Sequence, residues 1–420
     1  MPLVRFAVQG ALLVPLLVPG EPLRLETLVA EALRSNPEIL AARERWEAAR
    51  QRPSRASSLP DPVVSFGYAS VGRPWPLAGL GRYPTANAGL MFMQEFPAPG
   101  KLRLEGAMAE EEAAAEFHQY QAVALSVVAR LKQAYHRLQG AHAAADALLR
   151  NRELLDKLVA VAQARYAAGL STTQDVLRAQ TEISLLEVRR VRLLEEQNSR
   201  RAEINSLLAR PYDAALEGSL TPQYSLDATL APLPSLHELL RSAERNSPLL
   251  ACEQRQIARS ELALNAARKD FYPDFALSAG YFSMGSMGSM YMFRADITLP
   301  LYAARKQRPA LALGLGQLRS ARRTYEAEAL TLRARIQEAY LSAEATRQRA
   351  NLYRTTVIPQ AGLALEAAFA AYETGAADFT SVLSNFSALL GYEADYYQEV
   401  TSYYLALTRL EELTGEVLLR

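Results

Sequence analysis

Four short segments of the chain alternate between apolar residues and small or polar residues at every second position. In the segment 63–69, for example, Phe66 and Tyr68 fall on one face and Ser65 falls on the other. A period of two predicts β-strands with one apolar face, here at 63–69, 86–96, 275–281 and 290–299. The apolar faces carry Val64, Phe66, Tyr68, Leu90, Phe92, Phe96, Phe275, Leu277, Tyr281, Tyr291, Phe293, Ile297 and Leu299.

Elsewhere the apolar residues recur every three or four positions, as at Val127, Leu131 and Tyr135, which predicts amphipathic helices. The segment 101–167 has no proline and only two glycines, Gly106 and Gly140. One helix is predicted over its whole length, roughly 100 Å at 1.5 Å per residue. An all-helical coiled-coil scaffold would explain this spacing, but it would not explain the strand pairs.

The same order of motifs occurs twice in the chain. Leu59-Pro60-Asp61 recurs as Tyr272-Pro273-Asp274, and the Tyr-x-x-Gly motif at 166–169 recurs at 372–375. Each half predicts a helix of moderate length (25–52 or 235–268), two strands, a very long helix, a glycine turn and a returning helix. The second long helix, at 307–372, contains Pro359, which we expect to kink or break its last turns.

This duplication sets the domain organisation. We predict a signal peptide at 1–20, a first structural repeat at 21–210, an inter-repeat linker at 211–234 and a second repeat at 235–420. The fold class is mainly α with a small β part. The signal peptide is predicted because Arg5 precedes an apolar stretch too short to cross a bilayer, although an apolar leader on a cytosolic protein is an alternative.

Composition excludes several classes of function. The 46 Lys and Arg residues balance 45 Asp and Glu residues, so the net charge of +1 does not favour nucleic acid as a partner. The single cysteine, Cys252, excludes an internal disulfide. His118 and His136 share a helix face but lie roughly 27 Å apart along the axis, which is too far for the two side chains to bind one metal ion. No nucleophile–base set or phosphate loop occurs, so we predict no enzyme activity, no catalytic residue and no cofactor.

The alternation of the four strands is typical of membrane strands, with an apolar side for lipid and a polar side for a lumen, although soluble half-buried strands alternate as well. Four strands cannot close into a barrel, and an open edge in lipid would leave backbone groups unpaired at several kcal/mol each. The smallest closed membrane barrels have about eight strands. The pattern therefore predicts that several copies share one barrel, without setting their number.

Several motifs make the chain similar to a known family. They are Leu25-Glu26 through Asn36-Pro37, Leu59-Pro60-Asp61-Pro62, Gln94-Glu95-Phe96-Pro97 with Gly100-Lys101, and Arg165-Tyr166-x-x-Gly169 followed by Asp175-Val176-Leu177. Over 23–415 the chain resembles the TolC-family outer-membrane factors, most of all their heavy-metal (CusC- and CzcC-like) branch. The resemblance implies a homotrimer in outer-membrane lipid that shares a twelve-stranded transmembrane barrel. It also implies a periplasmic tunnel of long helical hairpins, a periplasmic adaptor (membrane fusion) protein and an inner-membrane pump.

The resemblance further implies that the helical tips bind the adaptor. Both long hairpins reverse at a glycine, Gly169 or Gly375, where a left-handed backbone is expected. The expected adaptor-binding residues are Arg165, Gly169, Leu170, Asp175 and Gly375. Some relatives close the tunnel with carboxylates, but this chain has Ser381 and Ser384 at those places. Asp378 and Phe379 are the remaining candidates for a constriction, and a helix N-cap is the alternative for Asp378.

Six of the eight methionines lie in or between the predicted strands. By the alternation, Met91, Met93, Met290 and Met292 are expected to face the lumen. Thioethers favour soft ions such as Cu(I), so these four are speculative metal contacts. The alternative is that methionine fills space in a pliant sheet, and we predict no defined metal site.

The predicted function is a passive outer-membrane channel of a tripartite efflux system, with heavy-metal ions or small toxic compounds as cargo. A periplasmic coiled-coil adaptor or a structural scaffold protein is the alternative. The sequence identifies neither the cargo nor the energy source of the pump.

Overall fold

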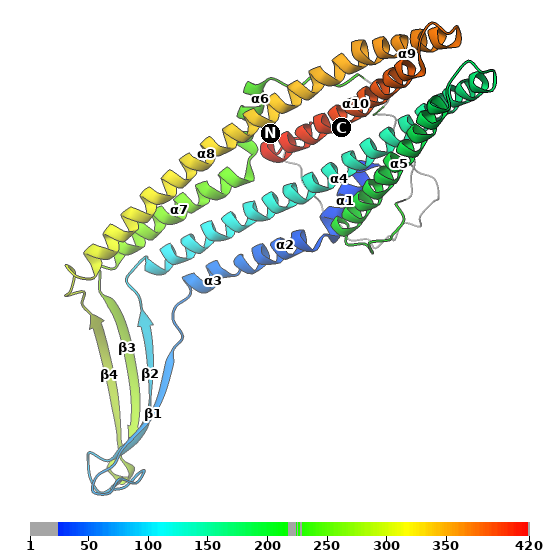
Figure 1. The fold of residues 1–420 in the computed structure, drawn as a ribbon. Helices are drawn as coiled ribbons and strands as arrows, with labels where there is room; N and C mark the ends of the chain where they lie inside the picture. Colours follow the sequence, from blue (N-terminus) through cyan, green and yellow to red (C-terminus); the bar gives the residue numbers. More distant parts are fainter. Residues whose placement is uncertain (1–23, 217–223, 225, 227–228, 419–420) are drawn as a thin grey trace. The chain divides into compact units, whose positions relative to one another are not determined.

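The computed structural model describes residues 24–216, 224, 226 and 229–418. The predicted signal peptide at 1–20 lies outside these residues. Figure 1 shows the elements, which in chain order are α1 (Leu25–Ser35), α2 (Pro37–Ala49), α3 (Arg52–Ser57), β1 (Val63–Ala69), β2 (Asn87–Phe96), α4 (Lys101–Ala167), α5 (Thr173–Leu207), α6 (Leu236–Asn246), α7 (Pro248–Lys269), β3 (Asp274–Ser283), η2 (Gly285–Met287), β4 (Ser289–Thr298), α8 (Gln307–Leu352), the π-helical turn η3 (Tyr353–Val357), α9 (Ile358–Glu373) and α10 (Phe379–Thr414).

The chain divides into two compact units, and each takes segments from both halves of the sequence. The hairpin unit comprises the described residues of Met1–Asn36, Val128–Leu233 and Leu341–Thr408. The sheet unit comprises Pro37–Val127, Pro234–Tyr340 and the described residues of Arg409–Arg420. Elements of one repeat therefore pack against elements of the other within each unit.

The four strands form one antiparallel sheet in the order β1-β2-β3-β4. Directly opposed residues share a face of such a sheet. Phe66 on β1 lies opposite Leu90 on β2, which lies opposite Tyr281 on β3. Tyr281 in turn lies opposite Tyr291 on β4, with 5.5 Å between the ring centroids. The predicted strands and their shared apolar face are confirmed, and Phe66 and Phe293 are each 82% exposed on that face.

The other face of the sheet carries the small and polar residues. Met91 lies opposite Ser65 on one side and Gly280 on the other, and Gly280 lies opposite Met292. Within the described residues, β1 and β4 each pair along one side only. Both outer edges of the sheet therefore present backbone groups without a partner strand.

The first helix predicted in each half, at 25–52 and 235–268, is broken before a proline. α1 ends before Asn36-Pro37, and α6 ends before Ser247-Pro248. Asn36 (ψ 123) and Ser247 (ψ 116) are extended because the proline ring disfavours a helical conformation in the residue before it. The prediction of uninterrupted helices is wrong at these two points.

The two long helices follow the prediction more closely. α4 runs without a break over Lys101–Ala167, the predicted range. Near Pro359 the helix does not end; it widens into the π-helical turn η3 and continues as α9. A proline removes one backbone donor and crowds the carbonyl four residues earlier, and the wider turn accommodates both effects.

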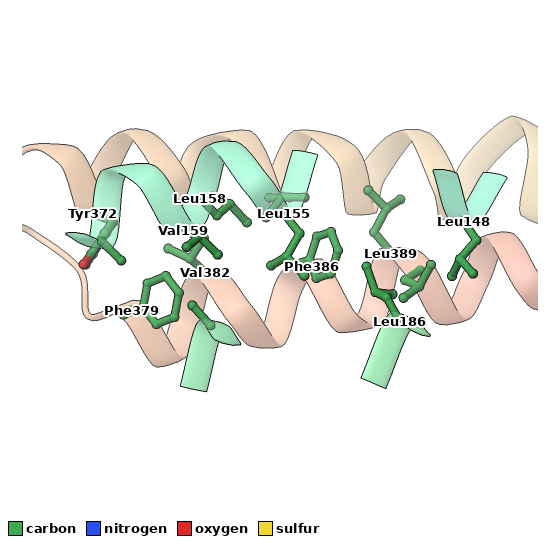
Figure 2. Close-up of a cluster of buried hydrophobic side chains, with 14 residues drawn as sticks. Leu148, Leu155, Leu158, Val159, Leu186, Tyr372, Phe379, Val382, Phe386 and Leu389 are labelled. Carbon is green, nitrogen blue, oxygen red and sulfur yellow. The ribbon is translucent and has the colours of Figure 1, made fainter. Parts of the chain in front are cut away.

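A core of side chains from α4, α5, α9 and α10 holds the hairpin unit together (Figure 2). Burial of one Leu or Phe side chain contributes about 1.5–3 kcal/mol, so this core joins the α4–α5 hairpin to the α9–α10 hairpin. Its buried members are Leu148, Leu155, Leu158, Val159, Ala162, Ala179, Leu186, Leu365, Tyr372, Phe379, Val382, Phe386, Leu389 and Leu390.

Candidate functional site

Both hairpins of the hairpin unit reverse at a left-handed glycine. Gly169 has φ +73 and Gly375 has φ +79. The residue after each glycine donates its backbone N–H to a carbonyl five residues earlier: Leu170 to Arg165 at 2.8 Å, and Ala376 to Ala371 at 2.8 Å. These are the bonds of a glycine C-cap, which satisfies the last carbonyls of the helix. The two tips therefore have the same backbone conformation at the end of the first helix of each hairpin.

The next helix starts with a capping box at the first tip. The carboxylate of Asp175 accepts a hydrogen bond from the backbone N–H of Thr172 at 3.3 Å and another from the Ser171 hydroxyl at 2.8 Å. This carboxylate satisfies donors within its own turn. The structure therefore gives Asp175 a part in shaping the tip.

Arg165 joins the two tips. Its guanidinium donates to the carbonyl oxygens of Tyr372 at 2.7 Å and Glu373 at 2.8 Å, at the C-terminal end of α9. It also lies over the Tyr372 ring, 4.8 Å from the centroid. A positive charge at a helix C-terminus is favourable, and hydrogen bonds from charged donors contribute about 1.5–3 kcal/mol each before solvent screening. Arg165 is therefore a clamp between the hairpins.

The remaining tip residues are exposed. Leu170 is 66% exposed and Tyr166 is 48% exposed. A Cβ added at Gly169 would meet no heavy atom within 4 Å, whereas one at Gly375 would lie 3.5 Å from the Arg165 guanidinium. Of the expected adaptor-binding residues, Gly169 and Leu170 thus lie on open surface, and Gly375 lies beside the clamp.

The two candidates for a constriction occupy different environments. The Asp378 carboxylate accepts a hydrogen bond from the backbone N–H of Ser381 at 3.1 Å, so its alternative role as the N-cap of α10 is confirmed. Phe379 is only 1% exposed, and its ring lies 5.4 Å from that of Tyr372 (Figure 2). Phe379 packs inside its own protomer, so its side chain is not available to narrow a bore.

Two contacts between the hairpins at the tips involve residues that were not predicted to belong to the site. The Ser171 hydroxyl lies 3.4 Å from the Tyr372 hydroxyl, and Arg178 donates to the Thr380 hydroxyl at 2.5 Å. The repeated Tyr-x-x-Gly motif marked Tyr372 in the sequence but did not indicate its partners. Residues about 200 positions apart in sequence meet here, and no local pattern reports such a contact.

The methionines of the sheet surround an aromatic ring that the alternation did not single out. Phe282 lies opposite Gly89 and Met290, on the same face as Met91 and Met292. A Cβ at Gly280 would lie 2.7 Å from the Phe282 ring. The ring therefore covers the glycine between Met91 and Met292. The alternation along β3 puts Phe282 on this face, and Gly89 and Gly280 leave room for its ring.

No group of three or more His, Cys, Asp or Glu side chains that could hold a metal ion occurs among the described residues. Met93 lies one row further along the methionine face, opposite Val63 and Ser278. The register places Met91, Met93, Met290 and Met292 on the face predicted for them. Their role as soft-metal contacts stays a prediction.

Within the hairpin unit, a buried histidine contacts Tyr224, in the segment predicted as the inter-repeat linker. His136 on α4 is 2% exposed, its Nδ1 lies 3.1 Å from the Tyr224 hydroxyl, and its ring stacks on Tyr404 of α10 with 4.8 Å between centroids. Burial, assisted by the positive charge of Lys132, lowers the pKa of His136 to about 3. The neutral imidazole therefore belongs to the folded state.

Because His136 is buried in its neutral form, we expect the folded protein to lose stability as the pH falls. Because the pKa of His136 is lower in the folded state than its ordinary 6.5, its stabilising contribution is complete above about pH 6.5 and is lost as the pH falls toward 3. Denaturant unfolding of the protein at steps between pH 7 and pH 4 is expected to show a steeper loss of stability for the wild type than for His136→Gln. Equal slopes for the two proteins would contradict this assignment.

No helix within the described ranges is both long enough and apolar enough to span a bilayer. The model of the outer membrane efflux protein family matches residues 28–210 and 239–416. The chain belongs to this family. The resemblance seen in the sequence motifs is thereby confirmed, and the adaptor and scaffold alternatives have no support.

Individual relatives agree with the family assignment. The chain is 26% identical, over 257 residues, to the cobalt-zinc-cadmium resistance protein CzcC of Cupriavidus metallidurans. That alignment covers 60% of this chain but only 59% of CzcC, less than two thirds of the relative's length. The protein resides in the outer membrane, as its family does.

Solved structures show the same fold. The outer membrane protein VceC of Vibrio cholerae has a TM-score of 0.78 at 21% identity, covering 93% of this chain and 96% of VceC. CusC, described as forming a transmembrane channel, has a TM-score of 0.78 at 15% identity, covering 94% and 92%. The predicted combination of long helical hairpins with a small four-stranded sheet is thus the fold of these two proteins.

Proposed function

We propose that this outer membrane efflux protein is the passive exit channel of a tripartite export system. The observation that carries the proposal is the four-stranded sheet, whose aromatic face is exposed and whose two edges have no partner strand within the described residues. Such a sheet is suited to form part of the wall of a transmembrane β-barrel, but the four strands of a single copy cannot close that barrel. The family match supports the same function.

The assembled channel would be a homotrimer. Three copies with four strands each would close a twelve-stranded barrel, in which β4 of one protomer pairs with β1 of the next. Closure would satisfy the backbone donors and acceptors at both edges, which lipid cannot do. The helical hairpins of the three copies would continue the barrel as a periplasmic tunnel.

The tips would bind a periplasmic adaptor that is coupled to an inner-membrane pump. The exposed turn at Gly169 and Leu170 would supply the contact surface. Arg165, Asp175 and Gly375 would hold that turn in its shape. Asp378, present three times in a trimer, would be the acidic group closest to a constriction at this end. The energy for transport would come from the pump, because the channel itself is a conduit.

Heavy-metal ions are the proposed cargo, and small toxic compounds are the broader alternative. The similarity to CzcC, whose name states resistance to cobalt, zinc and cadmium, favours metals. The methionine face of the sheet, with Met91 and Met292 on either side of Gly280, would offer passing ions polarisable contacts. The metal here is a substrate in transit, so it needs no fixed coordination sphere.

A deletion strain tests both the channel and its cargo. Loss of the protein is expected to lower tolerance to cobalt, zinc, cadmium, copper or silver, and the wild-type gene should restore it. Unchanged tolerance to all five metals would remove the metal cargo. Fractionation of the complemented strain tests the channel separately: the protein should appear in the outer membrane as an oligomer that dissociates on heating. A monomer in the soluble fraction would contradict the channel.

A further inference from the structure

The two loops at the free end of the sheet form one connected surface. The loop between β1 and β2 and the shorter loop between β3 and β4 meet at this end (Figure 1). The backbone N–H of Gly81 donates to the Met284 carbonyl at 3.0 Å, and the Ser286 hydroxyl donates to the Gly81 carbonyl at 2.9 Å. A Cβ at Gly81 would lie 3.0 Å from the Ser286 hydroxyl oxygen. The loops are thus packed closely together, and we call them the loop cap.

The loop cap exposes large apolar side chains. Trp75 is 69% exposed, Leu77 51%, Tyr83 42% and Met287 41%. Leu77 also has φ +63, a left-handed conformation that bulky residues rarely adopt. Two turn hydrogen bonds flank it: the Ala78 N–H donates to the Trp75 carbonyl at 3.1 Å, and the Leu80 N–H donates to the Leu77 carbonyl at 3.1 Å. Strained backbone that presents an exposed apolar side chain is typical of binding surfaces.

Charge along the sheet is strongly asymmetric. Between Asp61 and Glu95 the sequence has two arginines, Arg73 and Arg82, and no carboxylate, and between Asp274 and Arg294 it has no charged residue. The loops therefore have a local excess of positive charge, although the net charge of the whole chain is only +1. Arg73 and Arg82 are exposed, and neither forms an ion pair with a described residue; the Arg82 guanidinium lies 5.9 Å from the Tyr83 ring. The loop cap is therefore basic and aromatic.

We propose that the loop cap binds the phosphorylated headgroups of outer-leaflet glycolipid, as in lipid A. The inference rests on the proposed function, which places this end of the sheet at the outer leaflet. Guanidinium groups bind phosphate through paired, charge-assisted hydrogen bonds, and Trp and Tyr favour the boundary between acyl chains and headgroups. Arg73 and Arg82 supply the phosphate contacts, while Trp75 and Leu77 enter the acyl boundary. The apolar face of the sheet continues this surface toward the membrane interior.

Native mass spectrometry of the detergent-purified oligomer tests the proposal, with diphosphoryl lipid A and its fully dephosphorylated form as probes. The wild type is expected to retain the diphosphoryl form about tenfold better, because each arginine near an anionic headgroup adds a modest attraction. The variant Arg73→Gln/Arg82→Gln should lose this preference. The charge-matched control Arg43→Gln/Arg323→Gln, in helices of the same unit, should keep it.

Equal retention of both probes by the wild type would overturn the proposal, because the contact would then be apolar only. A preference that persists in Arg73→Gln/Arg82→Gln would overturn it as well. Competition by glucosamine phosphate at the concentration of the lipid would show binding of free phosphate and would also contradict a lipid site. Insertion of the wild-type oligomer into liposomes is measured in parallel. If the oligomer inserts but shows no preference for diphosphoryl lipid A, only this inference fails. If it does not insert, the proposed function fails.

Discussion

Replacement of Arg165 by alanine is expected to lower export through the assembled system by about tenfold or more, without reducing the amount of oligomer in the outer membrane. The guanidinium donates two hydrogen bonds, at 2.7 and 2.8 Å, to the last carbonyls of α9 and covers the Tyr372 ring. Loss of charged hydrogen bonds of about 1.5–3 kcal/mol each, reduced by solvent screening at this half-buried site, would let the two tips separate. The hydrophobic core behind the tips should keep the fold.

Two further variants sharpen this test. Arg165→Lys keeps the charge but loses the planar fork, so partial activity is expected. Arg152→Ala, on the same helix, removes ion pairs with Asp156 and Glu187 that lie away from the tip, and it should export normally. Metal tolerance of the deletion strain carrying each variant, together with immunodetection of the membrane oligomer, gives the comparison. Wild-type tolerance in Arg165→Ala would show that the clamp is not needed.

Gly140→Val is expected to prevent stable folding of the hairpin unit or to lower its stability by about 3 kcal/mol or more. Gly140 lies in the interior of α4, and a Cβ there would overlap the Thr401 hydroxyl of α10. Overpacking a close helix contact typically destabilises by about 1–3 kcal/mol, and the branched side chain adds to this. The temperature at which the purified oligomer dissociates is the measurement, with the variant expected well below the wild type.

Gly391→Ala is the matched control. Gly391 also lies inside a helix, α10, but a Cβ there would meet nothing within 4 Å. Alanine in a helix interior is favoured over glycine by about 0.5–1 kcal/mol, so this variant should be at least as stable as the wild type. Addition of Thr401→Ala to Gly140→Val should recover part of the loss. Equal stability of Gly140→Val and the wild type would disprove the close contact between α4 and α10.

Periodic patterns predicted the elements well, because they depend on neighbouring residues. The period of two placed β1 at 63–69, and the absence of proline predicted α4 over its full range. The breaks before Pro37 and Pro248 were also encoded locally. There the dipeptides Asn36-Pro37 and Ser247-Pro248 were interpreted as markers of the repeat, and their effect on the backbone was missed.

The candidate site was only partly predictable, because its decisive contacts join distant residues. Arg165 was expected to face a partner protein, yet its guanidinium binds carbonyls 207 and 208 residues further along the chain. Tyr224 reaches His136 across 88 residues. Phe282 was missed for a simpler reason, because the predicted strand ended at 281 whereas β3 continues to Ser283. The contacts of Arg165 and His136, by contrast, depend on how distant segments pack together, and no single segment of the sequence encodes them.

Cross-linking between the edges of the sheet tests the shared barrel most directly. In a Cys252→Ser background, Ser65→Cys on β1 is combined, one at a time, with cysteines along β4 from Ser289 to Thr298 and oxidised in outer-membrane fractions. We expect at least one pair to yield dimers and trimers that resist boiling without reductant, and no larger species. Monomers from every pair, or a ladder that continues beyond three copies, would contradict a trimeric barrel closed between β4 and β1.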